Sequence, residues 1–490
     1  LAAAFTTQGI QSVAVGHSAA FTNQSDSCVA IGAFAGQTTQ ATHSVAVGHS
    51  AGMTTQATQS VAVGHSAGLT NQGSLAVAIG QQGGAINQQQ ETVAIGSYAG
   101  YGTQGHRAIA IGTSAGSNNQ EERAIAIGTC AGYNGQGTMA VAIGSSSGYQ
   151  GQSQGAVAIG HWAGSLNQED DCIAIGTCAG QGFGANKQLK NAIAIGREAG
   201  RIEQGEQSIA IGTRAGESNQ KSNCIAIGNT AGYTNQEIYG LAIGYHAGKT
   251  DQKFSAVAIG NCAGSNTQSS MAIAIGDYAG KTTQKSKAVA IGYLAGNDNQ
   301  LLSAVAVGAK AGSNNQGALA VAIGADAGMT TQQSSAVAIG YKAGQTNQAI
   351  TAVAIGSDAG ESNQKVSAVA IGLWAGFDNQ KTLAIAIGNQ AGKTVQGMQA
   401  VAIGNCAGIT NQLDAAVAIG NCAGHTTQSL NAVAIGNSAG QITQGQQGVA
   451  IGAFAGMTNQ GVSAVAIGNV AGSNAQLRDA VAIGTSAGCS

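Results

Sequence analysis

The chain has nine cysteines, which could bind a metal, react as nucleophiles or form cross-links. None belongs to a Cys-x-x-Cys pair, the spacing typical of zinc and redox sites. Five of them share one slot of an internal repeat, and two of these, Cys406 and Cys422, lie one repeat apart. Strands stacked about 4.8 Å apart bring such neighbours within disulfide range. A bridge is feasible in an oxidising compartment, but we expect free thiols.

Histidines are the second set of potential metal ligands. His17, His49, His65 and His161 occupy one slot of the repeat, and His49 and His65 lie in consecutive repeats. Two imidazoles can share a transition-metal ion. Because the same slot also holds Asn, Thr, Tyr and Ala, we interpret these histidines as ordinary solvated side chains and predict no metal site.

The segment Gly180–Gly184, followed by Lys187, has the glycine content of a phosphate-binding loop. It lacks the helix onto which such loops open, so we interpret it as a bulged corner. It is still the best single candidate for a local contact site, because loops carry function more often than repeats do. The chain has no Ser/His/Asp order, paired carboxylates or cofactor fingerprint above chance. The sequence predicts no enzymatic activity and no cofactor.

These residues are set in a 16-residue repeat, A-V-A-I-G-x-x-A-G-x-[TSN]-[NT]-Q-x-x-x, that covers the chain. Units begin every 16 residues from Ser12 to Cys172, and again from Ala192 to Ala480, after a four-residue insertion within 178–191. A fixed short period, with units too small to bury a core alone, is the signature of a solenoid. We predict an all-β, parallel β-solenoid with one coil per repeat, forming a single domain over 1–490. Partial repeats at both ends suggest a window of a longer chain.

Composition supports a sheet and excludes several partners. The chain has 77 Gly and no Pro, and Pro is confined to sheet edges and bulges. Charged residues make up 8% and the net charge is −2. A dispersed, nearly neutral charge gives no electrostatic footprint for nucleic acid or an anionic membrane. No apolar run is long enough to span a bilayer, so we expect no membrane insertion within this segment.

The A-V-A-I-G segment predicts a strand with two different faces, because side chains alternate along a strand. The second and fourth positions are β-branched almost throughout, and we predict them as core, with Val29, Ile31, Ile273 and Ile275 as examples. The first and third positions are mostly Ala. An exposed Ala stripe would mark an interface, so we expect it to contact identical chains, around a threefold axis or by lateral pairing, through Ala256, Ala258, Ala272 and Ala274. The two Gly slots predict corners with positive φ or close backbone approach.

Gln recurs at one slot of the repeat without variation while neighbouring slots vary freely. A solvated surface residue would have drifted with them. We therefore predict an inward or corner position in which the amides of successive coils hydrogen-bond in a ladder and set the register. Representative members are Gln24, Gln40, Gln56, Gln252, Gln268 and Gln284.

Segments such as Ser12–Gly16, Ala76–Gly80 and Gly448–Gly452 resemble the head repeat of trimeric autotransporter adhesins. The resemblance covers the chain in repeats but five of the 16 positions in motif; the family unit is typically shorter and lacks the Gln column. It implies a left-handed β-roll assembled as a homotrimeric rod. The A-G-x-T-N-Q form, as in Ala67–Gln72, also resembles adhesin-like repeats of large DNA viruses and other microbes. We find no heptad stalk and no anchor barrel.

Together these features favour a non-enzymatic structural fibre or adhesin shaft, extracellular, on a cell or virion surface. Its expected partner is itself, as a trimer or bundled filament, with a host surface or glycan as a further one. Aromatic rings in variable slots could contact sugars; the candidates are Trp162, Trp374, Tyr98 and Phe183. The alternative is an ice-binding solenoid, for which Thr38, Thr39, Thr54 and Thr55 fit a flat array that Asn118 and Leu166 interrupt.

Overall fold

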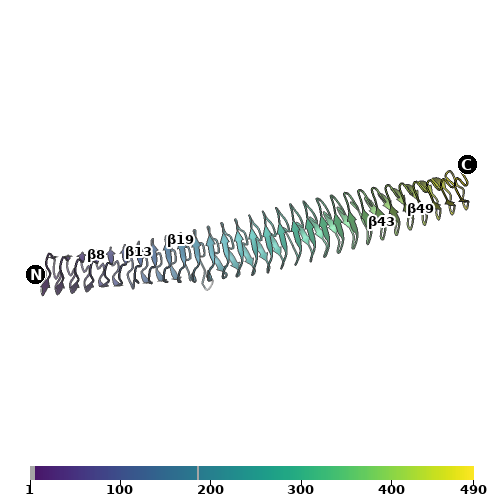
Figure 1. Cartoon of the computed structure of the whole chain (residues 1–490). Coiled ribbons are helices and arrows are strands. Elements are labelled where there is room, and N and C mark those ends of the chain that lie inside the picture. The colour runs from purple at the N-terminus through teal and green to yellow at the C-terminus, as the bar shows by residue number, and fades with distance from the viewer. Residues whose placement is uncertain (1–5, 185–186, 490) are drawn as a thin grey trace. The chain divides into compact units, whose positions relative to one another are not determined.

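The computed structural model describes residues 6–184 and 187–489. In this part of the chain every regular element is a β-strand, so no helix has the length and hydropathy of a membrane span. The coils form two compact units, Leu1–Thr250 and Asp251–Ser490, which we describe separately. In each unit successive coils stack side by side (Figure 1). The interpretation of residues 1–490 as one continuous domain stays a prediction.

Each coil has two short strands. The first occupies the second to fourth positions of the repeat, from β2 (Val13–Val15) to β54 (Val481–Ile483), and includes β8 (Val61–Val63), β13 (Ile109–Ile111), β19 (Val157–Ile159), β43 (Ile385–Ile387) and β49 (Val433–Ile435). The second ends on the Gln slot, as in β9 (Thr70–Gln72) and β37 (Thr330–Gln332), and shortens to two residues in β3 (Asn23–Gln24) and β5 (Thr39–Gln40). In some coils only isolated bridges stand in its place, as at Gln104 and Gln284.

The strand pairings are parallel and keep strict register. β4 (Val29–Ile31) pairs with β6 (Val45–Val47) so that Val29 lies opposite Val45, 16 residues later. Across the insertion the offset becomes 20 residues: β20 (Ile173–Ile175) pairs with β21 (Ile193–Ile195), with Ile173 opposite Ile193. The strands on both sides of the insertion therefore stay in register, and the expected parallel β-solenoid of about 30 coils is confirmed.

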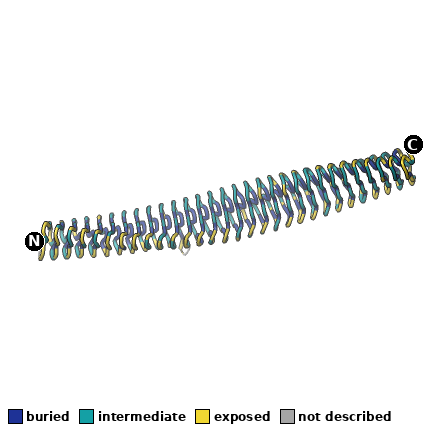
Figure 2. The backbone as a smooth tube through the Cα atoms, viewed as in Figure 1, coloured by how far each residue is buried: buried dark blue, intermediate teal, exposed yellow. Residues whose placement is uncertain are grey.

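The two faces of the first strand are the reverse of those predicted. The Ala positions are buried, with 0% exposure at Ala256, Ala258, Ala272 and Ala274, so they cannot form an oligomer face. The predicted core residues Val29, Ile273 and Ile275 are only half-buried, and Ile31 is 40% exposed. Figure 2 shows the buried stretches recurring from coil to coil.

The size of the interior explains this reversal. A Cβ added to Gly36 would lie 3.0 Å from Gln40 Oε1 and 3.5 Å from Ala30 Cβ, so Gly, Ala and Gln already meet inside the coil. A 16-residue coil encloses a space that methyl groups and one amide fill to contact distance. Branched side chains do not fit there. They turn outward, where their β-propensity still stabilises the strand.

The predicted Gln ladder is confirmed inside both units. Gln24 donates to Gln40 Oε1 at 3.1 Å and Gln40 to Gln56 Oε1 at 3.1 Å; in the second unit Gln252 donates to Gln268 at 3.1 Å and Gln268 to Gln284 at 3.1 Å. Each amide also satisfies backbone carbonyls, as Gln40 does with Val29 O at 2.8 Å. All these side-chain bonds run in one direction, from each coil to the next along the chain.

In the described part of the chain, two oxygens of the ladder have no hydrogen-bond partner, those of Gln24 and Gln88. Gln72 Nε2 donates to Val61 O and Ala76 O, at 2.8 and 3.3 Å, and Gln88 Oε1 is left buried without a hydrogen-bond partner. In the coil of Gln88 the usual Ala before the corner glycine is replaced by Gly83. The unsatisfied oxygen marks a local weak point in the first unit.

The corners require backbone conformations that most side chains disfavour. Gly48 has φ 132°, and a Cβ there would lie 2.4 Å from Gly64 O in the next coil, so this slot admits only glycine. Other corner slots adopt the left-handed region with non-glycine residues, commonly Asn, as at Asn411 (φ 49°), but also β-branched ones such as Val395 (φ 50°). The predicted role of the two Gly slots is confirmed.

Candidate functional site

The outward side of the first strand is an apolar surface that recurs in every coil; we call it the valine–isoleucine face. Each unit has fifteen first strands, and each strand contributes two outward side chains, all Val, Ile or Leu241. Among the more exposed are Ile79 (37%), Ile291 (37%), Ile323 (39%) and Ile451 (37%). Because the strands are in register, the side chains form two parallel rows within each unit. No charged residue interrupts the rows.

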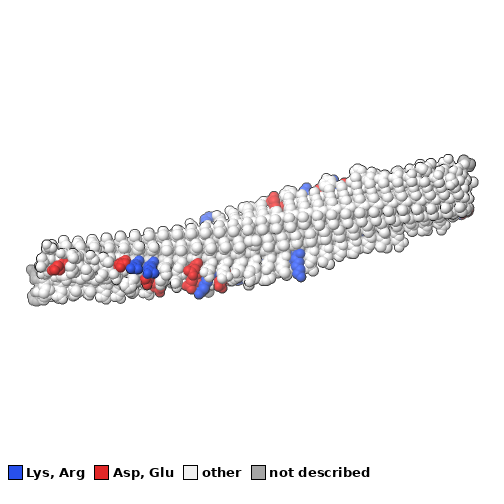
Figure 3. Space-filling model, in the orientation of Figure 1, with Lys and Arg blue, Asp and Glu red and all other residues white. Residues whose placement is uncertain are grey.

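The corner that precedes the first strand, at repeat positions 14 to 16, carries exposed apolar side chains and ion pairs in both units, since Leu75 and Met139 are exposed in the first and Lys381 pairs with Asp414 in the second. In the second unit the exposed apolar side chains include Leu301 (40%), Leu302 (51%), Leu319 (60%), Ile350 (48%) and Leu383 (49%). In the first unit the corner carries ion pairs between neighbouring coils, such as Arg107 Nε to Glu91 Oε2 at 2.8 Å and Lys190 Nζ to Asp170 Oδ2 at 3.0 Å. Figure 3 shows charged side chains as small isolated groups on an otherwise uncharged face.

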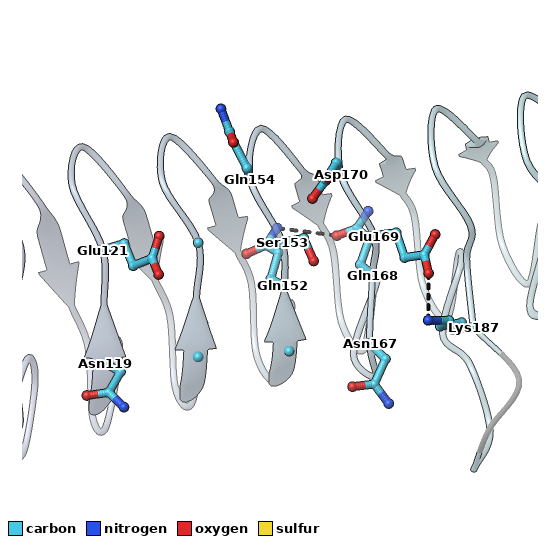
Figure 4. Close-up of a pocket in the computed structure, with 13 residues that line it drawn as sticks. Asn119, Glu121, Gln152, Ser153, Gln154, Asn167, Gln168, Glu169, Asp170 and Lys187 are labelled. Atoms are coloured by element: carbon cyan, nitrogen blue, oxygen red, sulfur yellow. Dashed lines mark hydrogen bonds and ion pairs between the residues drawn. The ribbon is translucent and has the colours of Figure 1, made fainter.

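A hollow of about 820 Å³ lies in the first unit where glycines replace side chains in adjacent coils. Gly135, Gly137 and Gly151 form its floor, and polar side chains rim it (Figure 4). A hollow opens here because these glycines leave neighbouring gaps in the rows of side chains. The glycines are visible in the sequence, but only the stacked register shows that they are neighbours.

The carboxylates at this hollow already have partners. Glu121 Oε2 accepts hydrogen bonds from Thr138 N at 3.0 Å and Thr138 Oγ1 at 2.8 Å. Glu169 Oε1 lies 2.5 Å from Lys187 Nζ, the contact drawn dashed in Figure 4. The predicted corner loop thus borders the hollow through Lys187, while residues 185–186 of its insertion lie outside the described part. The rim therefore holds ion pairs rather than an acid or base free for catalysis.

The four aromatic residues predicted as ligand contacts are not brought together. Trp162 and Tyr98 are each 39% exposed and Phe183 is 43% exposed, but they lie on different coils of the first unit. Phe183 packs under Arg201, with its guanidinium 5.1 Å from the ring centre. Trp374, in the second unit, is partly buried, and Lys393 Nζ lies 4.7 Å from its ring centre. Tyr98 contacts the ring of Tyr101 and Trp162 that of His161, but the four predicted rings do not join into one aromatic platform.

Two of the four threonines of the ice-binding alternative donate to neighbouring coils, while Thr39 and Thr55 are exposed. Thr38 Oγ1 donates to Met53 O at 3.3 Å, and Thr54 Oγ1 donates to Leu69 O at 3.2 Å. A hydroxyl that donates to a neighbouring coil does not offer that proton to a water lattice. This geometry weighs against a threonine array as a ligand surface.

Among the described residues no cysteine forms a disulfide, and this includes the neighbours Cys406 and Cys422. Burial raises the pKa of Cys172 to about 12 and that of Cys224 to about 11. Their Sγ atoms contact Leu189 O at 2.8 Å and Glu237 O at 2.9 Å. These two thiols fill Ala positions of the core and are too weakly acidic to react as nucleophiles.

Among the described residues, no group of three or more His, Cys, Asp or Glu side chains is placed to hold a metal ion. The stacked pair His49 and His65 is confirmed as a contact, with ring centres 5.1 Å apart.

No protein-family model, no curated protein and no solved structure matches this chain.

Proposed function

We propose that this chain is a non-enzymatic structural fibre or adhesin shaft, exposed on a cell or virion surface, that assembles with identical chains through the valine–isoleucine face. The observation that carries the proposal is the pair of outward apolar rows on the described first strands, whose side chains are partly exposed along each unit and more than a third exposed at positions such as Ile291 and Ile323. Contiguous apolar surface of this extent on a soluble protein marks an interaction site.

The size of this surface favours a permanent interface. If each of the thirty outward side chains in a unit exposes about 50 Å², the face of one unit amounts to on the order of 1,500 Å², well above the roughly 800 Å² per partner of a standard interface. Interfaces that bury more than this and are strongly apolar are typical of obligate oligomers.

The repetition of the face favours a copy of the same chain as the partner. Rows with a constant step in one molecule fit rows with the same step in another, so methyl groups interdigitate along the whole contact. Three chains around one axis would bury the face of each. Lateral pairing would meet the same need, and the resemblance to trimeric adhesin heads favours the trimer and a left-handed coil.

The hollow, the thiols and the exposed rings described above agree with a structural role. The hollow is rimmed by ion pairs, the buried thiols are inert, and the exposed rings are scattered. Variable corner slots, together with Trp162 and Phe183, would then present contacts to a host surface or glycan. This presentation is the adhesin part of the proposal.

The experiment is the absolute mass of the purified chain by light scattering, in reductant and at several concentrations. We expect a mass near three times the 47.8 kDa of one chain. The double variant Ile291→Asp, Ile323→Asp places two charges on the face and should lower the mass, while Lys281→Asp, in a variable slot outside the first strand, should not. A wild-type chain that stays monomeric would contradict the proposal, and a stable dimer would contradict the trimer alone. A monomer that showed thermal hysteresis would support the ice-binding alternative.

A further inference from the structure

Two consecutive coils of the first unit carry the same His-Ser dipeptide at the corner that follows the first strand. The residues are His49 and Ser50 in one coil and His65 and Ser66 in the next. Backbone hydrogen bonds fix the two corners against each other, with Ser66 N donating to His49 O at 2.8 Å and Gly64 N to Val47 O at 2.8 Å. The two imidazoles are therefore carried on a rigid scaffold at a fixed spacing.

The rings lie parallel, with an interplanar angle of 6° and centres 5.1 Å apart. Each ring contacts its own serine in the same way: Nδ1 of His49 lies 3.0 Å from Ser50 Oγ, and Nδ1 of His65 lies 3.2 Å from Ser66 Oγ. Both serines are 7% exposed, so their hydroxyls are held in place. With matched contacts and parallel rings, the two Nε2 atoms lie on the same side of the corner.

The serine contact is compatible with a free lone pair on the other ring nitrogen. When Nδ1–H donates to the serine oxygen, Nε2 carries the lone pair that a metal ion needs. Metal-binding histidines in proteins generally donate their other N–H to a fixed acceptor, which sets the tautomer and the ring orientation. Ser50 and Ser66 stand where such acceptors stand.

We propose that His49 and His65 form a two-histidine site for a divalent late transition-metal ion, with Cu²⁺ bound most tightly. Imidazole nitrogens suit Cu²⁺, Ni²⁺ and Zn²⁺, and Cu²⁺ leads the affinity order for such ligands. Two nitrogens bonded to one ion at about 2.0 Å lie roughly 3 Å apart, so the rings tilt toward each other when the ion binds. Water or a ligand from another molecule completes the coordination.

The surroundings limit the site to these two side chains. The ring of Phe34 separates His49 from His17, with its centre 5.7 Å from His49 and 5.3 Å from His17. No charged residue occurs between Asp26 and Glu91 in the sequence, so neither coil offers a cation that would repel the ion or a carboxylate that would replace an imidazole. Both histidine side chains are exposed, so the ion reaches them from solvent.

The test is a calorimetric titration of the full chain with Cu²⁺ in the presence of glycine as a weak competitor. Accessible thiols are alkylated beforehand with iodoacetamide, because Cu²⁺ reacts with free cysteine. We expect one site whose affinity falls at least tenfold in His49→Asn and equally in His65→Asn. The matched control is His161→Asn, which removes a histidine from the same slot where no neighbour pairs with it. Electron paramagnetic resonance of the Cu²⁺ complex should show two imidazole nitrogens in the wild type and one in either variant.

Two further variants separate metal binding from a packing role of the rings. Gln81→His adds a third histidine in the next coil and should tighten binding. The double variant Ser50→Ala, Ser66→Ala keeps both rings but removes the acceptors, and should weaken binding by about 10-fold or more. Equal affinities in the wild type and His65→Asn would overturn the proposal, as would equal losses in His65→Asn and His161→Asn.

Discussion

Gln40 Nε2 and Gln56 Oε1 are joined by a hydrogen bond of 3.1 Å inside a core that contains no larger polar group. The same nitrogen also donates to Val29 O at 2.8 Å, so the Gln40 side chain links the next coil to the first strand of its own coil. The stability of each coil therefore depends on its neighbour through a buried amide as well as through the sheet.

Removing one amide from the ladder should be costly. In Gln332→Leu the apolar side chain can neither donate to Val321 O and Gln348 Oε1 nor accept from Gln316, contacts of 2.9, 3.0 and 3.1 Å. We expect a loss of about 3 kcal/mol or more in the free energy of unfolding, because buried polar groups are left unpaired. Urea denaturation measures it. The neighbouring Gln333→Leu, at an exposed position, should change stability by less than about 0.5 kcal/mol; similar losses at both sites would refute the structural role of the ladder.

Enlarging the side chain at an Ala position should destabilise the fold more than altering the adjacent branched side chain. Ala274 has 0% exposure and its Cβ would lie 3.2 Å from a Cβ added to Gly280, so Ala274→Leu has no space to enter. We expect a destabilisation of about 3 kcal/mol or failure to fold. Ile275→Leu, on the outward side, should cost less than about 1 kcal/mol. Thermal unfolding followed by circular dichroism compares the two variants. A larger loss of stability in Ile275→Leu would indicate that the branched residues, and not the Ala residues, form the core.

Relieving strain at a corner should stabilise the fold. Val395 is β-branched at φ 50°, in a slot where the next coil has Asn411 at φ 49°. Val395→Asn should raise the free energy of unfolding by about 1 kcal/mol, since Asn tolerates the left-handed region and Val does not.

The converse substitution, Asn411→Val, serves as the matched control and should lower stability by a similar amount. Chemical denaturation of both variants gives the comparison. If the two changes shifted stability in the same direction, the backbone conformation of this slot would not be the cause.

Thiol reactivity should follow burial. With burial raising the pKa of Cys172 to about 12 and of Cys224 to about 11, almost no thiolate is present at pH 8, and we expect neither to be alkylated by iodoacetamide in the folded chain. Cys489 is exposed and should react first. Peptide mass spectrometry after a timed pulse measures the order. In denaturant all nine cysteines should react alike; early labelling of Cys172 in the native chain would contradict its place in the core.

The sequence was sufficient to predict the parallel solenoid, the period, the glycine corners and the Gln ladder, because each depends on a constraint that repeats in every unit. It was not sufficient to decide which face of the strand points inward. Alternation separates Ala30 from Ile31 but does not say which is inside, and the usual assumption that the larger apolar residue is buried is wrong here. The deciding quantity is the width of the coil, which depends on the corner geometry.

The binding surfaces were less predictable for a related reason. The valine–isoleucine face can be recognised only once the Ala positions are known to point inward. The hollow at Gly135 and Gly151 can be recognised only once it is known which residues stack. The pairing of His49 with His65 was visible in the spacing. Their contacts to Ser50 and Ser66, which orient the rings, needed the backbone conformation of the corner.

The ladder passes from Gln168 to Gln188 with a bond of 3.1 Å, although 20 residues separate them instead of 16. A coil thus recognises its neighbour by the buried amide and the strand, and not by the distance between them along the chain. For the gene this means that unequal crossing-over that adds or removes whole repeats should still yield a folded product. The number of coils can then change between generations without any new contact having to evolve.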